Sequence, residues 1–582
     1  MAQVVVPPAS EIPIPPPPAT DSGAPKPDTI QAPFGRSVGP RTADIGPQYQ
    51  WNREEMFASG ALTVADLLER VPGMTGFRSG WLASPKFTAL NGDLNRVRLY
   101  YDGIEMDNLD PVSAPLLDLT TVELWTLESV QVERFANELK VHLRSWRVDR
   151  TNPYTRTDVF TGDEDTNLYR GFYGKRFGSG AGLQLAGQQF STRAARLGGG
   201  GDALSFMARA GIARRMWSID AFGLRRGSSR TRQPTFSTTD GLSIRDFDGK
   251  HDLYYVRAAL GNPTGGAWAQ VIGSYMRFAD RSPHVSAAEA FSNMLVADTT
   301  DTTTSRYQYV GAVGYSRGAI RASLQDRVRA FDEETYHTPA ARLEVAGARG
   351  VASLYAESNQ FSRATRADVI GRFTPLPFVA IAGAYSVSEP FDSVSSSAPP
   401  PWKAARLEVG IRLFNPWLIG GFITRDTAVL VGPQLVDTAY QAVPIGKRQG
   451  MYAGLRGTLF KDVNVDIVGT RWDSAGYYQP RYQARSEVNI TTRWMSRFPS
   501  GNFGLKIAFI HEYRDRVNFP TPSGLRTTRA SGIMNGLVEI RILRGVASYQ
   551  IRNIAGENYQ MFPDFFMHRT INLYGIRWEF WN

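Results

Sequence analysis

Residues 402–416 read Trp402-Lys403-Ala404-Ala405-Arg406-Leu407-Glu408-Val409-Gly410-Ile411-Arg412-Leu413-Phe414-Asn415-Pro416. From residue 406 to residue 413 apolar and charged side chains largely alternate, with Leu407, Val409, Ile411 and Leu413 on one side and Arg406, Glu408 and Arg412 on the other. A period of two is typical of a β-strand whose faces meet different surroundings. A short turn at Phe414-Asn415-Pro416 then leads into a second such run near 416–427. The stretch therefore predicts a β-hairpin with one apolar face.

Similar runs extend in both directions from this hairpin and occupy residues 153–582. We count 22 of them. They lie near 154–162, 168–177, 181–191, 204–215, 216–227, 252–262, 266–279, 305–317, 318–331, 339–348, 351–363, 365–373, 378–389, 402–414, 416–427, 447–459, 463–474, 481–496, 502–515, 530–543, 544–554 and 569–580. Short connections such as 178–180 alternate with long ones such as 228–251 and 280–304. Strands of about ten residues with this alternation indicate an outer-membrane barrel. We expect an all-β transmembrane barrel of about 22 antiparallel strands.

Two soluble architectures compete with the barrel. A propeller would repeat every 40–50 residues or so with a blade motif, and no such repeat is visible. A set of β-sandwiches would not alternate short and long connections over so many strands. The net charge of +10 is the only feature that favours a nucleic-acid-binding β protein. That interpretation does not explain the alternating loop lengths either. We therefore expect no nucleic-acid partner.

The composition excludes several kinds of site. The 582 residues contain no cysteine, which rules out disulfides, a thiolate zinc site and a cysteine nucleophile. No run of about 20 apolar residues could form a membrane-spanning helix. The first residues lack a basic region followed by an apolar one, so no signal peptide is visible. For a barrel of this kind we expect that the signal has been cleaved.

The N-terminal residues 1–48 hold 12 of the 35 prolines, including the run from Pro15 to Pro18. Proline at this density favours an extended, semi-rigid segment. We interpret 1–48 as a periplasmic tail, either a spacer or a segment that reaches a partner.

Residues 49–152 differ from the barrel region and predict a small α+β domain. Thr63 is a plausible N-cap of a helix that ends at Val71-Pro72-Gly73. Val97 to Tyr101 predicts a strand that is closed by a turn at Asp102-Gly103. Two further strands are expected at 128–134 and 141–146. A 22-strand barrel is too wide to be filled by its own side chains, so we expect this domain to lie inside the lumen.

Three of these segments resemble the TonB-dependent outer-membrane receptors. The stretch from Thr63 to Gly73 is similar to the opening motif of their plug domain, Val97 to Gly103 to the strand ending in Asp-Gly, and Glu128 to Arg134 to the next segment. After Arg134 the chain continues Phe135-Ala136-Asn137 where the family usually has Gly-Pro, which indicates a shortened, divergent plug.

The resemblance implies a function in the cell outer membrane. It implies a receptor that imports a scarce solute, such as a siderophore, vitamin or nutrient, by TonB-dependent active transport. It implies no enzymatic activity, no catalytic residues and no cofactor. The alternative is a non-energised plugged barrel with a structural, adhesion or accessory-subunit role. The cargo is a small molecule, peptide or glycan that the sequence does not specify.

The resemblance also implies a short segment ahead of the plug that pairs with a periplasmic energy transducer by β-augmentation. The best candidate is Asp28-Thr29-Ile30-Gln31-Ala32, and Val4-Val5-Val6 is a second. A plain linker would have the same composition.

Candidate ligand-binding residues come from two sources. Arg225, Arg226, Arg230 and Arg232 cluster near a long loop, where guanidinium groups could bind an anionic ligand or lipopolysaccharide phosphates, or simply end the strand. By the resemblance, plug loops at 78–84 and 106–110 join the ligand site. The candidate ligand-binding residues are therefore Trp81, Asp110, Arg226 and Arg232.

No metal site is expected. The six histidines are scattered and none is paired at metal-ligand spacing. Asp163-Glu164-Asp165 could bind calcium, although a solvated acidic loop is the simpler interpretation.

Overall fold

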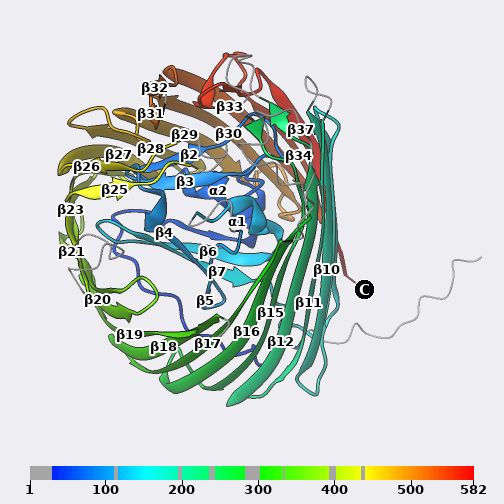
Figure 1. Cartoon of the computed structure of the whole chain (residues 1–582). Helices are drawn as coiled ribbons and strands as arrows, with labels where there is room; N and C mark the ends of the chain where they lie inside the picture. The colour runs from blue at the N-terminus through cyan, green and yellow to red at the C-terminus, as the bar shows by residue number, and fades with distance from the viewer. Residues whose placement is uncertain are drawn as a thin grey trace, which may run out of the picture.

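The computed structural model describes residues 29–110, 116–194, 199–234, 243–281, 302–331, 334–391, 401–433, 440–522 and 524–581. Within these ranges 22 strands form one closed antiparallel barrel, seen from one end in Figure 1. They are β8 (Tyr154–Gly162), β9 (Thr166–Arg176), β10 (Ala181–Ala194), β11 (Gly199–Ala213), β12 (Trp217–Arg230), β15 (Phe247–Gly261), β16 (Gly266–Asp280), β17 (Thr302–Arg317), β18 (Ile320–Phe331), β19 (Glu334–Gly347), β20 (Gly350–Asn359), β21 (Ala364–Leu376), β22 (Val379–Pro390), β23 (Trp402–Arg412), β24 (Trp417–Arg425), β27 (Arg448–Phe460), β28 (Val463–Trp472), β29 (Tyr482–Thr492), β30 (Phe503–Arg514), β33 (Ser531–Ile542), β34 (Gly545–Arg552) and β37 (Ile571–Trp581). The predicted fold and strand number are confirmed.

The alternation in β23 separates the two faces of the wall. Leu407 and Val409 are 55% and 45% exposed on the outside, whereas Glu408 between them is 2% exposed and points into the lumen. Arg412, expected on the polar face, is exposed at the end of the strand and donates to the Asn415 carbonyl at 3.3 Å. An outer surface of regularly exposed apolar side chains is the face that a bilayer covers.

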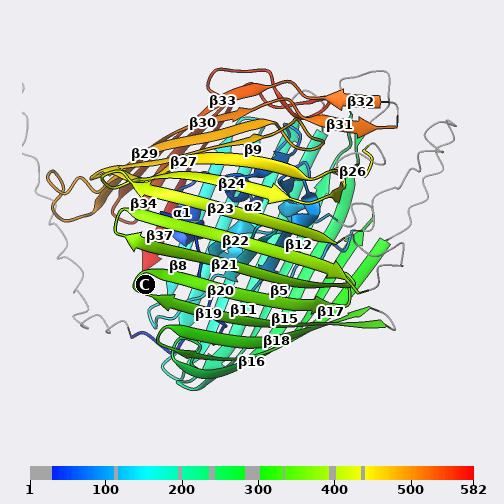
Figure 2. The same cartoon turned by 90° about the vertical axis from the view of Figure 1, so that its left-hand side faces the viewer.

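Short turns gather at one end of the barrel and long loops at the other. Strand β37 ends at the short-turn end, where Figure 2 marks the C-terminus, and β8 begins beside it because the two strands pair. In outer-membrane barrels the short turns are periplasmic.

The lumen holds a small α+β domain, which Figure 1 shows inside the ring of strands. Its five-stranded sheet has the order β1-β6-β7-β4-β5. Its elements are β1 (Gln50–Asn52), α1 (Arg53–Phe57), α2 (Val64–Leu68), the 3-10 helix Leu94–Arg96, β4 (Val97–Tyr101), β5 (Ile104–Glu105), the 3-10 helices Leu119–Thr121 and Leu124–Thr126, β6 (Leu127–Arg134) and β7 (Leu139–Ser145).

Local sequence explains where these elements begin and end. Thr63 is the N-cap of α2, as predicted, and the Asp66 carboxylate accepts from the Leu62 and Thr63 amides at 2.9 and 3.1 Å. The turn after β4 has Asp102 at φ 51° and Gly103 at φ 96°. Positive φ favours Asp or Asn and above all Gly, which is why this strand ends in Asp-Gly.

The long-loop end is partly closed by short hairpins. They are β2–β3 of the plug (Met74–Phe77 and Phe87–Leu90) and, in the loops, β13–β14 (Gln233–Pro234 and Ser243–Ile244), β25–β26 (Ala428–Leu430 and Val443–Ile445), β31–β32 (Asn518–Thr521 and Gly524–Thr527) and β35–β36 (Gln560–Phe562 and Phe565–Phe566). Their side chains meet around Phe519, whose ring centroid lies 5.8 Å from that of Phe77 and 5.5 Å from that of Phe562. This aromatic cluster packs the outer loops onto the plug.

Residues 32–47, which we call the rim segment, lie inside the barrel along its short-turn end. The Gly35 amide donates to Ser218 of β12 at 2.7 Å and the Arg41 amide to Glu344 of β19 at 3.0 Å. Arg456 of β27 donates to the Pro47 carbonyl at 2.8 Å. This part of the proline-rich segment is therefore extended and follows the wall. Residues 1–28 lie outside the described part of the chain.

In the described ranges, no helix has the length and apolar character needed to cross a membrane.

Candidate ligand cavity and plug anchorage

A cavity of about 140 Å³ lies between the plug and the wall, on the long-loop side of the plug sheet. Plug residues 106–110 and 117–123 form one side, and strands β9 to β16 form the other. Apolar side chains provide much of the lining, among them Leu109, Leu117, Phe247, Leu253 and Phe278. A site with apolar walls and a few fixed polar groups is typical of small-molecule recognition.

Arg226 on β12 meets the plug at Glu123. Its Nε lies 2.9 Å from Glu123 Oε1, and Gln188 of β10 donates to the other carboxylate oxygen at 3.0 Å. Trp125 also donates to that oxygen, at 2.8 Å. The carboxylate is thus fully engaged, and Arg226 is held at the cavity wall, where its other guanidinium nitrogens make no ion pair or hydrogen bond with the described residues.

Arg245 forms the second charged contact. It pairs with Asp110 of the plug loop and, at 2.7 Å, with Asp280 at the end of β16. Its carbonyl accepts from Arg230 at 3.2 Å. Three arginines, two on β12 and one in the connection from β12 to β15, therefore surround the plug loop that was predicted to contact ligand.

His251 is a polar residue of the cavity that takes no part in these charged contacts. Its ring lies 4.9 Å from that of Phe278 and 5.9 Å from that of Phe247, and it lines the cavity. In the described residues its buried Nδ1 has no hydrogen-bond partner. A buried polar atom without a partner is costly, so a ligand that supplies one gains affinity. With the nearby arginines, this arrangement favours an anionic group on an otherwise apolar ligand.

The structure separates the four predicted ligand residues. Asp110 and Arg226 both line the cavity. Trp81 is buried against Gly201 and lines a smaller cavity of about 90 Å³, whereas Arg232 lies in the loop, 3.7 Å from Asp246. Sequence reasoning missed Glu123, Arg245 and His251, because only the fold brings them beside residues far away in the chain.

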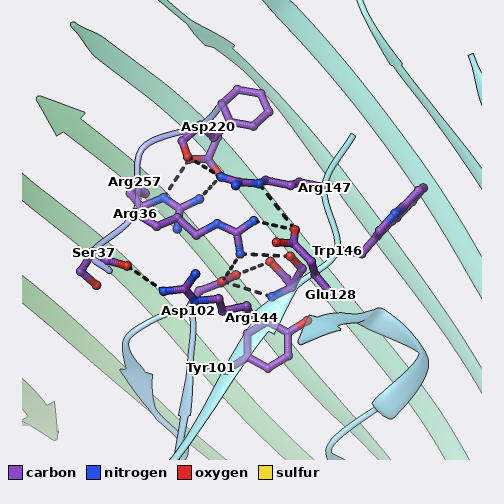
Figure 3. A network of polar contacts seen from close by, with 12 residues as sticks. Arg36, Ser37, Tyr101, Asp102, Glu128, Arg144, Trp146, Arg147, Asp220 and Arg257 are labelled. Atoms are coloured by element: carbon purple, nitrogen blue, oxygen red, sulfur yellow. Dashed lines mark hydrogen bonds and ion pairs between the residues drawn. The ribbon is translucent and has the colours of Figure 1, made fainter. Parts of the chain in front are cut away.

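The plug is anchored to the short-turn side by a buried polar network around Asp102, drawn in Figure 3. The Asp102 carboxylate lies 3.2 Å from Arg36 of the rim segment and 3.4 Å from Arg209 of β11. Tyr255 of β15 donates to it at 2.7 Å. Burial alone would raise the pKa of Asp102, but the charges of Arg36, Arg257 and Arg209 outweigh it and hold that pKa well below its usual range.

Arg36 joins the rim segment to three parts of the plug. Besides Asp102 it contacts Glu128 of β6 at 3.2 Å and donates to the Ser145 carbonyl at 3.1 Å. Because the rim segment precedes the plug, a force on the N-terminal tail would reach this network through Arg36.

A second anchor lies at Glu105 of β5. Arg98 of the plug contacts one carboxylate oxygen at 2.6 Å, and Arg327 and Arg329 of β18 contact the other at 2.8 and 2.6 Å. Burial opposes ionisation, yet the three guanidinium groups, Arg98 foremost, place the Glu105 pKa well below its usual range. Plug and wall thus meet through charged pairs as well as apolar packing.

The predicted energy-coupling segment is paired within the chain. Ile30 forms an antiparallel bridge with Arg150, and the Gln31 amide donates to the Asp149 carbonyl at 2.7 Å. The Ala32 carbonyl accepts from Arg176 of β9 at 2.9 Å. The Ile30 side chain is 74% exposed, so one side of this short strand faces outward. Asp28 lies outside the described residues, as does Val4 to Val6.

The described residues show no group of three or more His, Asp or Glu side chains arranged to hold a metal ion. In the acidic loop, Glu164 contacts His568 at 2.9 Å and Asp165 contacts Arg193 at 3.6 Å. Asp163 accepts from the Asn572 amide at 2.8 Å. These carboxylates therefore have partners within the protein.

Comparison with known proteins identifies the lumen domain. Residues 45–139 match the family model described as the TonB-dependent receptor plug domain. A comparison with curated protein sequences gives no match.

Solved structures with the same fold cover nearly the whole chain. The siderophore receptor PirA from Acinetobacter baumannii superposes with a TM-score of 0.67 at 9% identity, covering 91% of this chain and 98% of that one. The FrpB iron transporter from Neisseria meningitidis gives 0.68 at 9% identity, covering 92% and 100%. The copper transporter OprC gives 0.67 at 12% identity, covering 93% and 100%. At such identities the likeness establishes the fold alone.

Proposed function

We propose that this chain is an energised importer of a scarce solute, because a TonB-dependent receptor plug domain lies inside a closed 22-strand outer-membrane barrel. The observation that carries the proposal is the path of the chain ahead of the plug. Residues 29–47 connect the N-terminal tail to the Asp102 network and to the wall strands in turn. A pull on the tail would act first on the pairing of Ile30 and Gln31 with residues 149–150, next on the Gly35 contact with the wall, and then on the Arg36 contacts that hold the plug.

The cargo site that the geometry supports best is the cavity between plug and wall. Arg226, Arg230 and His251 provide donors, and the apolar walls suit a ligand with a hydrophobic body. We infer that this cavity binds a small anionic solute. Two further candidates from the sequence would act outside this cavity: Trp81 in the neighbouring smaller cavity and Arg232 in the outer loop.

The test uses the full chain in detergent and the soluble periplasmic domain of the organism's own energy transducer, with calorimetry as the readout. We expect saturable binding that is lost when residues 28–32 are scrambled. Scrambling Thr20 to Ala24, in the same tail, is the matched control and should leave binding unchanged.

The pairing of Thr29 to Gln31 with residues 149–151 favours a second candidate, a plugged barrel with a structural, adhesion or accessory role. In that case the segment serves only to fix the tail to the linker between the plug and the first barrel strand. Absence of binding to every transducer of the organism would make this second candidate the leading one.

A further inference from the structure

On the outer face of the wall, one row of directly paired residues crosses seven neighbouring strands. We call such a row a register level. One half of this level is rich in glycine and the other half is charged. Residues directly opposite in antiparallel strands point to the same face. From β8 to β16 the paired residues are Thr157, Gly171, Gly187, Phe206, Arg225, Asp252 and Arg277. Arg225 is half-exposed and Phe206 is exposed, which places this level on the outside of the barrel.

The glycine half of this level is a hollow in the apolar surface. An open groove of about 660 Å³ runs over Gly171, Gly187 and Gly223. A Cβ added at Gly171 would meet no atom within 4 Å. The rings of Phe206 and Tyr254 border the groove, since they lie 3.3 Å and 3.1 Å from the positions that a Cβ would take on Gly187 and Gly223. The surface is therefore shaped for an apolar chain rather than for flat contact.

The other half carries positive charge. Arg225 and Arg277 are on strands that flank β15, with Asp252 between them, so their backbones are about 10 Å apart. The Arg225 Nε lies 3.6 Å from Asp252 Oδ1, which orients that guanidinium, whereas Arg277 has no ion pair with any described residue. Lys250, two residues from Asp252 and exposed, adds a third cation. Asp248, two residues beyond Lys250 and also exposed, adds a second carboxylate, so the three cations keep a net positive charge.

The next register level indicates how deep in the bilayer this cluster lies. Tyr254, Tyr275 and Tyr307 pair in a row one level nearer the short-turn end. Tyrosine rows of this kind mark the boundary between hydrocarbon and headgroups. Arg225 and Arg277 therefore lie at headgroup level on the long-loop side, and the groove beside them reaches into the hydrocarbon.

We propose that this surface binds one molecule of lipopolysaccharide, with a phosphate on Arg225 and Arg277 and an acyl chain in the glycine groove. Guanidinium groups bind phosphate with charge-assisted, bidentate hydrogen bonds. The outer leaflet supplies a lipid in which phosphates and several acyl chains are joined, which matches a cation cluster that continues into an apolar groove. This surface is on the outer face of the wall, whereas the cargo cavity is on its inner face, and the proposal does not depend on transport.

The experiment is native mass spectrometry of the full chain, extracted from outer membranes in mild detergent, to count retained lipopolysaccharide. The double variant Arg225→Ala/Arg277→Ala should retain at least tenfold less than the unmodified chain. Gly171→Leu places a side chain in the groove at a position where a Cβ meets no atom within 4 Å, and it should also reduce retention. The matched control is Lys403→Ala/Arg471→Ala, which removes two exposed cations from the long-loop ends of β23 and β28 and should retain the full amount.

Two results would overturn the proposal. The first is full retention by the arginine double variant, and the second is an equal loss in the control, which would mean that any outer cation serves. A change of electrophoretic mobility on heating verifies that each variant barrel is folded before it is compared.

A second arm distinguishes the lipid source. Delipidated protein is titrated with bisphosphorylated lipid A, with dephosphorylated lipid A and with phosphatidylglycerol. We expect the first to bind at least tenfold more tightly than the other two. Equal affinity for dephosphorylated lipid A would refute the role of the arginines, and equal affinity for phosphatidylglycerol would refute the choice of lipid.

Discussion

At the scale of single residues, Arg36 matters most for the link between tail and plug. It contacts Asp102, Glu128 and the Ser145 carbonyl from a segment that has no regular secondary structure of its own. A buried hydrogen bond to a charged group is worth about 2 kcal/mol, which corresponds to roughly a 30-fold change in a local opening equilibrium.

We therefore expect Arg36→Ala to speed hydrogen exchange in residues 32–41 by roughly 30-fold, as measured by mass spectrometry on the detergent-solubilised chain. Arg70→Ala is the control, because Arg70 pairs with Glu487 at 2.8 Å on another side of the plug and does not contact the rim segment. Equal acceleration in both variants would show that the rim segment responds to general loosening of the plug.

Asp102 gives the same network a dependence on pH. Its pKa is depressed by Arg36, Arg257 and Arg209 against the effect of burial. A depressed carboxyl pKa stabilises the folded state above the unfolded value of 3.8, and this contribution is lost as the pH falls below it. We expect the thermal midpoint of the plug, followed by near-ultraviolet circular dichroism, to be constant from pH 8 to about 5 and to fall below about 4.

Asp102→Asn is the informative comparison for that titration. It should lower the midpoint at neutral pH and reduce the slope below about pH 4, because one titrating group with a depressed pKa is gone. An unchanged slope would assign the acid sensitivity to other carboxylates, such as Glu105.

At the scale of elements, the short strand at Thr29 to Gln31 is the point where tail and barrel meet. The Gln31 amide donates to the Asp149 carbonyl at 2.7 Å, and proline cannot make that bond. We expect Gln31→Pro to free the segment and raise its susceptibility to protease several-fold. Ala32→Pro is the matched control, since in the described chain the Ala32 amide donates no hydrogen bond. Cleavage at equal rates in both variants would mean that proline itself, rather than the lost bond, loosens the tail.

The aromatic cluster at the long-loop end gives another test. Phe519 is fully buried and contacts Phe77, Tyr440, Tyr478 and Phe562. Truncating a buried phenylalanine costs about 3–5 kcal/mol. We expect Phe519→Ala to increase hydrogen exchange in loop 473–481 while the exchange of the barrel strands is unchanged. Phe414→Ala, at a turn residue that is 96% exposed, should change neither.

The sequence predicted the secondary-structure elements much better than the tertiary contacts between them. All 22 strands could be located because a wall with lipid on one side imposes a period of two on every strand, as at Leu407 and Glu408. The helix cap at Thr63 and the Asp102-Gly103 turn were equally local signals.

The cavity could not be predicted in the same way. It needs Asp110 beside Arg245 and Glu123 beside Arg226, and these pairs arise only when the plug is seated in the barrel. For the same reason the path of the rim segment along the wall was not predicted, because its partners Ser218, Glu344 and Arg456 are hundreds of residues away.

At the scale of the whole molecule, the wall and the plug are stabilised in different ways. Backbone hydrogen bonds close the wall into a ring with no free edge, and the surrounding hydrocarbon offers those groups no alternative partners. The plug is held to the wall by side-chain pairs such as Glu105 with Arg329 and Asp102 with Arg209. Denaturant should therefore release the plug well before it opens the ring.

This difference can be measured as conductance across a planar bilayer. We expect the intact chain to carry no steady current in buffer, and urea to open a large conductance that closes again when urea is removed, because the barrel never unfolds. Arg36→Ala should shift the urea midpoint downward by about 1 M, since about 2 kcal/mol is lost and small proteins have urea slopes of roughly 1–3 kcal/mol per molar. A steady current without urea would mean that the plug does not seal the barrel, whereas an identical midpoint in the variant would mean that Arg36 is not among the contacts that keep it closed.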